Sequence, residues 1–228
     1  MPSASPATSP FGSLSRLLVI GLISGLLASL PYTLAQQVWV APLLRQAEVL
    51  EPGPSGSVAS EPLMTGWRGA AVTNGVTGVG FGLLLAAAIS MRGVPPNLPS
   101  GPLWGMAGFA AFSLFPALTL PVGLPGLESA PLLIRQAWWA LAVISAAVGL
   151  ALLAWAPKRA GRIAGAAIVW LPPLASRLFW DWPETPPDLR ALQNRFAVAA
   201  LVTSALFWLA LGTLEGALSS LGRARQDA

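Results

Sequence analysis

The chain has 228 residues, of which 54% are hydrophobic and only 10% are charged, and its net charge is +4. Soluble domains usually carry about 25% charged residues, so this composition argues against a soluble domain and indicates an integral membrane protein. The chain has no cysteine and no histidine. Disulfides, iron–sulfur clusters and thiolate zinc sites are therefore excluded, and the usual general base is missing, so we expect neither an enzyme nor a bound cofactor.

The sequence predicts an all-α fold, a polytopic helical bundle in the membrane over residues 14–221. A Pro-, Ser- and Ala-rich tail over residues 1–13, predicted to be disordered, precedes it, and a polar tail over 222–228 follows. About six apolar runs have the length that a helix needs to cross a bilayer. They lie near residues 17–44, 70–91, 103–120, 137–156, 163–180 and 196–218.

Prolines and glycines indicate where these helices bend and where they touch. Pro116 in the third run and Pro172-Pro173 in the fifth remove helix hydrogen bonds, so we expect kinks there and an interruption of the fifth run. Glycines at small-residue spacing favour close helix packing over a phosphate-binding loop, because no Lys-Ser/Thr follows them. The predicted packing glycines are Gly78, Gly82, Gly105, Gly108, Gly212 and Gly216.

A few polar side chains fall inside or beside the apolar runs and are candidates for a substrate pathway. They are Gln36, Gln37, Asn74, Arg135, Gln136 and Arg177. The amides could instead hydrogen-bond across helices, and the arginines could reach the interface or pair with loop carboxylates. Glu215 lies near the end of the sixth run, and we interpret it as an interfacial carboxylate close to Arg223 and Arg225.

Carboxylates are concentrated in the segments between the runs, such as the polar loop predicted over residues 45–66. Jointly they could draw a cation toward the mouth of a pathway, although for any one of them solubilising charge is the simpler interpretation. Glu48, Glu51 and Asp181 are weak candidates for metal ligands. Without imidazole or thiolate, however, tight selection of cobalt or nickel would be difficult.

The distribution of basic residues predicts the orientation in the membrane. If all the runs span, Lys158, Arg159 and Arg162 form a basic cluster without acidic neighbours in one short loop. Such clusters lie on the cytoplasmic side, so we expect a multi-pass protein of the bacterial inner membrane with both termini in the cytoplasm. We interpret the few basic residues as determinants of this orientation and not as a nucleic-acid-binding surface. The expected partner is the lipid bilayer.

Several sequence blocks in combination resemble the CbtA family. They are Gln36-Gln37 with Pro42-Leu43 and Ala47-Glu48, Gly80–Ala87, Arg92-Gly93, Trp104–Phe112, Pro116–Leu118, Leu120-Pro121 with Leu124–Gly126, Arg135-Gln136 with Trp138-Trp139, and Arg195–Ala197 with Ala205–Trp208. The blocks span roughly residues 28–216. The most specific combination is WG-x-AGFAAF followed by LPG and RQ-x-WW.

The resemblance implies a proposed subunit of a cobalt (or related divalent cation) transporter, with a small histidine-bearing partner subunit, CbtB. Members often carry histidine where this chain has Ser113 and in the second position of Pro172-Pro173. Either a partner supplies the metal ligands, or this chain has another role. The alternative function is a non-catalytic structural or accessory subunit of a larger membrane complex.

Overall fold

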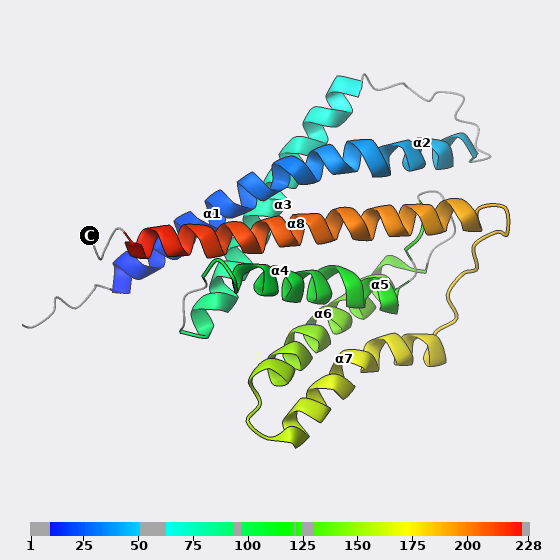
Figure 1. The fold of residues 1–228 in the computed structure, drawn as a ribbon. Coiled ribbons are helices and arrows are strands. Elements are labelled where there is room, and N and C mark those ends of the chain that lie inside the picture. The colour runs from blue at the N-terminus through cyan, green and yellow to red at the C-terminus, as the bar shows by residue number, and fades with distance from the viewer. Residues whose placement is uncertain (1–9, 51–62, 94–96, 121, 125–129, 225–228) are drawn as a thin grey trace, which may run out of the picture.

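The computed structural model describes residues 10–50, 63–93, 97–120, 122–124 and 130–224, and every regular element within these ranges is helical. The first half contains α1 (Pro10–Ala35), the π-helical turn η1 (Gln36–Val40), α2 (Ala41–Leu50) and α3 (Leu63–Met91). The second half contains α4 (Gly101–Phe109), the π-helical turn η2 (Ala110–Leu114), α5 (Phe115–Thr119), α6 (Leu132–Trp155), α7 (Arg159–Phe179) and α8 (Arg190–Ala224) (Figure 1).

The described helices confirm the expected membrane bundle, because five of them are long and apolar enough to cross a bilayer. These stretches are Ser15–Ala47, Gly66–Met91, Gly101–Thr119, Leu132–Trp155 and Arg190–Leu221. The fifth predicted run corresponds to α7, which is less apolar and does not belong to this set. Its 21 residues nevertheless extend about 32 Å, close to the thickness of a hydrocarbon core.

Contacts between side chains near the helix ends show which ends of the helices lie together. The Arg16 guanidinium donates a hydrogen bond to the Ser219 carbonyl (3.1 Å), so the start of α1 and the end of α8 lie together. Arg92, at the end of α3, lies 6.0 Å from the ring centre of Trp155, the last residue of α6. Between α6 and α8, α7 runs back along α6 (Figure 1).

The helix bounds correct some of the sequence-based expectations. Residues 45–50, predicted to be loop, continue the first long helix as α2. The predicted interruption of the fifth run is wrong, because α7 passes through Pro172-Pro173 without a break and buries both rings. The irregularity near Pro116 takes the form of the π-helical turn η2, which ends two residues before this proline, a residue that has no amide hydrogen to donate. Residues 10–13 of the predicted tail are helical; residues 1–9 lie outside the description.

Glycines bring α1 and α3 into direct backbone contact. A Cβ on Gly78 would lie 2.5 Å from the Gly25 carbonyl oxygen, and a Cβ on Gly82 would collide with the Gly21 carbonyl oxygen. The four glycines are buried and face one another in pairs. Any side chain at this seam would have to push the two helices apart.

A second glycine seam joins α4 to α8. A Cβ on Gly212 would lie 2.6 Å from the Gly105 amide nitrogen, and one on Gly216 would lie 3.1 Å from the Gly101 Cα. A Cβ on Gly105 would collide with the Trp208 carbonyl oxygen, and one on Gly108 with the Trp208 ring. All the predicted packing glycines are thus buried at helix contacts.

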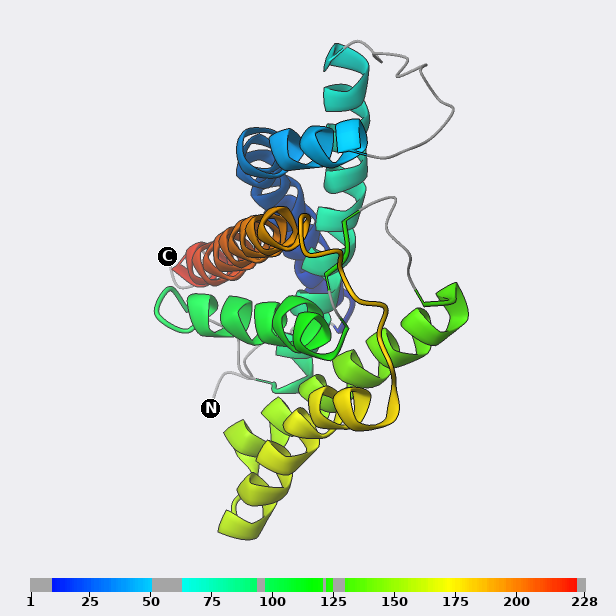
Figure 2. The same ribbon diagram turned by 90° about the vertical axis from the view of Figure 1, so that its right-hand side faces the viewer.

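The hydrophobic core lies where α1, α3, η2 and α8 meet. Its buried members are Ala28, Leu85, Ile89, Phe207, Trp208 and Leu211, with Phe81, Phe112 and Tyr32 packed against them. The hairpin of α6 and α7 extends away from this group and joins it mainly through η2 and α5 (Figure 2). The core therefore centres on the middle of α8.

Candidate functional site

The π-helical turn η1 carries the first group of polar side chains in the membrane. The Asn74 amide nitrogen, on α3, donates to Gln36 Oε1 (2.7 Å) and to Thr33 Oγ1 (3.0 Å). Thr33 in turn donates to the Ser29 carbonyl (2.8 Å). Gln36 and Asn74 are half-buried. We call Gln36, Asn74 and Thr33 the amide cluster; it links α1 and η1 to α3.

The second π-helical turn, η2, carries a smaller polar contact to α8. Ser113 and Ser204 share a hydrogen bond of 2.6 Å between their hydroxyl groups. Ser113 is the position at which the family resemblance leads us to expect histidine. In this chain the side chain at this position therefore links two helices by a hydrogen bond between hydroxyl groups. It cannot bind a metal ion through an imidazole.

A group of aromatic rings packs around the middle of α8. The Tyr32 ring lies 5.2 Å from that of Phe207, and Phe112 stacks on Trp208 with ring centres 5.5 Å apart. The ring centre of Phe81 lies 4.9 Å from that of Trp208 and 5.3 Å from that of Phe112. The two irregular turns, η1 and η2, both pack on α8. Such turns frequently occur at functional sites.

The remaining pathway candidates lie elsewhere. Gln37 is half-buried in η1, whereas Arg135, Gln136 and Arg177 are exposed on the α6–α7 hairpin. Gly149 of α6 meets Gly165 of α7 in antiparallel register, which places Arg177 at the level of Gln136. The candidates therefore form two groups: the amide cluster and Gln37 at or beside η1, and three exposed side chains at one end of the hairpin.

Of the three weak metal candidates, only Asp181 has a side chain within the described part of the chain. Asp181 is exposed after α7, while the side chain of Glu48 and all of Glu51 lie outside the description. Within the described ranges no three carboxylates gather where they could hold a metal ion. With no histidine or cysteine anywhere in the sequence, the metal donors are mainly carboxylate, amide, hydroxyl and carbonyl oxygens, together with the thioether sulfurs of four methionines.

Glu215 is buried inside the bundle, which was not expected from the sequence. We expected an interfacial carboxylate, but its side chain is 1% exposed inside the bundle. It lies on the same face of α8 as Trp208 and Leu211, seven and four residues earlier, and both are buried. That helical spacing from two large apolar residues was the available signal.

Comparison with known proteins identifies the family. The family model described as "Probable cobalt transporter subunit (CbtA)" matches residues 14–220. No curated protein and no solved structure matches the chain. The match covers nearly all of the helical bundle and confirms the resemblance found in the sequence blocks. The chain therefore belongs to the CbtA family of probable cobalt transporter subunits.

Proposed function

We propose that this chain is the membrane-embedded, non-enzymatic subunit of a cobalt transporter and that a partner subunit supplies the tight ligands for the ion. The observation that carries this proposal is the donor inventory. A cobalt transporter family is represented here by a chain without imidazole or thiolate. Cobalt binds well to nitrogen ligands, so selective capture requires donors from elsewhere. A small histidine-bearing subunit, as the family resemblance implies, would provide them.

The amide cluster is the best candidate for a polar step on the ion's path. Polar side chains inside a membrane are costly and commonly mark substrate pathways. Gln36 lies on a π-helical turn, where the hydrogen bond closing the turn runs from the Ala41 amide to the Gln36 carbonyl. Amide and hydroxyl oxygens suit the passage of a hydrated divalent cation, because they contact it without holding it tightly.

Asn74→Ala tests this role. We expect cobalt uptake to fall several-fold in cells that express the chain together with its genomic neighbours, because Asn74 joins both oxygens of the cluster. Interhelical hydrogen bonds in membranes contribute only about 0.6 kcal/mol on average, so the variant should still fold. Uptake of radioactive cobalt and the yield of monodisperse protein are measured together. Thr73→Ala, at an exposed neighbouring position, is the matched control.

A second function is favoured by the same cluster. Because Asn74 satisfies Gln36 and Thr33 directly, the polar groups could serve only to fasten helices in an accessory subunit of a larger membrane complex. In that case Asn74→Ala would lower the stability of the bundle and leave cobalt uptake unchanged per folded molecule. This outcome would contradict the pathway role.

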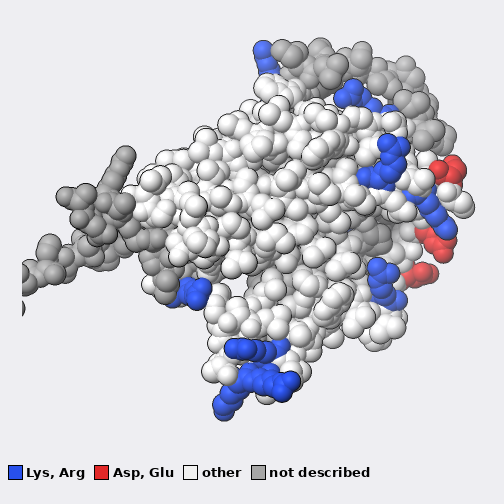
Figure 3. Space-filling view, in the orientation of Figure 1, with Lys and Arg blue, Asp and Glu red and all other residues white. Residues whose placement is uncertain are grey.

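We further propose six crossings with both ends of the chain in the cytoplasm of a bacterial inner membrane. The contact between Arg16 and Ser219 supports an even number of crossings, with α7 as the additional one. Figure 3 shows basic residues without acidic neighbours at the α6–α7 turn and acidic residues where α8 begins. The former belong to Lys158–Arg162, and the latter to Asp181, Glu184 and Asp188. The positive-inside rule then places the α6–α7 turn in the cytoplasm.

Cysteine labelling tests this orientation without background, because the chain has no cysteine of its own. Glu184→Cys and Lys158→Cys introduce single thiols at exposed positions. In intact spheroplasts, we expect a membrane-impermeant maleimide to label position 184 at once and position 158 only after permeabilisation. Labelling of position 158 first would reverse the orientation, and labelling of both from outside would contradict the crossing by α7.

A further inference from the structure

A carboxyl group is enclosed in the bundle, and neither the family assignment nor the proposed pathway uses it. The Glu215 side chain is 1% exposed, and its Oε1 atom has no hydrogen-bond partner among the described residues. The Ser24 side chain of α1 is completely buried, and its hydroxyl also lacks a partner there. Buried polar atoms normally have partners, so each such exception needs an explanation.

The two unpartnered groups lie in the same layer between α1 and α8. These helices are antiparallel: Arg16 bonds to Ser219 at one end, and Tyr32 contacts Phe207 further along. Ser24 lies midway between Arg16 and Tyr32 on α1. The register therefore places it opposite the turn 211–215 of α8, which ends at Glu215.

The surroundings offer little charge to balance an ionised carboxylate. On α1 the ionisable groups are Arg16, whose guanidinium donates to the Ser219 carbonyl one turn beyond Glu215, and Tyr32 at the far side of the core. The stretch 70–91 of α3, α4, η1 and η2 carry no ionisable side chain, and the charged residues of α2 lie at the opposite end of the bundle. On α8 itself the nearest is Arg223, whose side chain lies outside the description. An unpaired charge in such a site would be costly.

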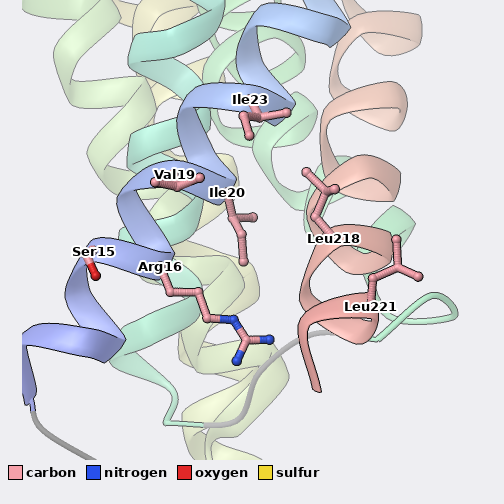
Figure 4. A pocket seen from close by; sticks show the side chains of 7 residues that line it. All are labelled: Ser15, Arg16, Val19, Ile20, Ile23, Leu218 and Leu221. Carbon is pink, nitrogen blue, oxygen red and sulfur yellow. The ribbon is translucent and has the colours of Figure 1, made fainter. Parts of the chain in front are cut away.

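A groove reaches the neighbourhood of this layer from the end of the bundle where α1 begins. Figure 4 shows it between α1 and α8, with Arg16 at its end and Ile20 and Leu218 pointing into it. Its volume is about 420 Å³. Leu218 follows Glu215 by less than one helical turn, so the groove brings the outside of the bundle close to the buried carboxyl group.

We propose that Glu215 is a proton-binding site, held as the neutral acid inside the bundle and able to exchange its proton through this end of the α1–α8 interface. A proton fits the site better than a metal ion, because one carboxylate and one hydroxyl are too few ligands for a divalent cation. The neutral acid also has an O–H group, which can donate a hydrogen bond to a hydroxyl oxygen such as that of Ser24. Coupling of this proton to cobalt movement rests on the proposed function; the protonated state does not.

A lipid-soluble carbodiimide tests the protonated state directly on the wild-type protein in membranes. Only the neutral acid reacts: its proton passes to one carbodiimide nitrogen, its oxygen bonds to the central carbon, and the acyl group then migrates to nitrogen as a stable N-acylurea. We expect mass spectrometry to find one added reagent molecule on the peptide containing Glu215. Labelling should decrease as the pH is raised, because deprotonation removes the reactive form.

Variants assign the label and exclude the alternatives. Glu215→Gln keeps the shape of the neutral acid and should lose the label, whereas Glu184→Gln, at an exposed loop carboxylate near Arg190, should keep it. Absence of the label on wild-type protein, or labelling of Glu215 by a water-soluble carbodiimide instead, would overturn the proposal. Protection of Glu215 by cobalt at constant pH would also overturn it, in favour of a cation site. All three outcomes are measured without a transport assay. A failure of this proposal can therefore be distinguished from a failure of the proposed function.

Discussion

Gly78→Leu is expected to separate α1 from α3 and to prevent most of the chain from assembling. A Cβ at this position would already lie 2.5 Å from the Gly25 carbonyl oxygen and 3.1 Å from the Ser29 Cβ. Overpacking of a tight core commonly costs about 1–3 kcal/mol, and here the obstacle is backbone that cannot rotate away. The measurement is the yield and thermal stability of monodisperse protein in detergent.

Gly80→Leu is the matched control for this prediction. It lies on the same helix two residues away, it is exposed, and a Cβ there meets nothing within 4 Å. Both variants add the same side chain to the same helix, so they share any effect on helix propensity or membrane insertion. If Gly78→Leu were as stable as Gly80→Leu, the close contact between α1 and α3 would be refuted.

The glycine seams show how much of the fold the sequence contains. The spacing in the apolar runs predicts that Gly78, Gly82, Gly212 and Gly216 lie at close helix contacts, and all are buried there. The spacing does not tell which helices pair, because any two small-residue faces can approach each other. That α3 packs on α1, and α8 on α4, depends on the arrangement of the whole bundle.

The surroundings of the polar residues were predicted for some of them and missed for others. Interhelical hydrogen bonding of Gln36 and Asn74 was one of two interpretations, and the structure contains that bond. The burial of Glu215 was not predicted. A carboxylate near the end of an apolar run is normally interpreted as interfacial, because the sequence does not show how far the helix continues beyond that run. The helix α8 continues to Ala224, which moves its end well beyond Glu215.

The π-helical turns could not be predicted from local sequence. Pro116 explains a disturbance upstream of it in the third run, since the ring cannot donate a hydrogen bond. Pro42 likewise lies two residues after the end of η1, but Pro172 and Pro173 lie inside α7 without any π-helical turn, so proline alone does not predict one. An extra residue in a turn is stabilised by its neighbours, here α8 and the amide cluster, and these contacts form only in the folded bundle.

The central claim, that this chain moves cobalt only with ligands supplied by a partner, predicts an all-or-none result. Cells lacking their own cobalt importers would express the chain alone, a histidine-bearing partner subunit encoded beside it alone, or both, and accumulation of radioactive cobalt would be measured. We predict uptake above background only when both are present, because the chain has no histidine or cysteine. Equal uptake by the chain alone, or no cobalt-dependent difference in any of the cells, would contradict the account.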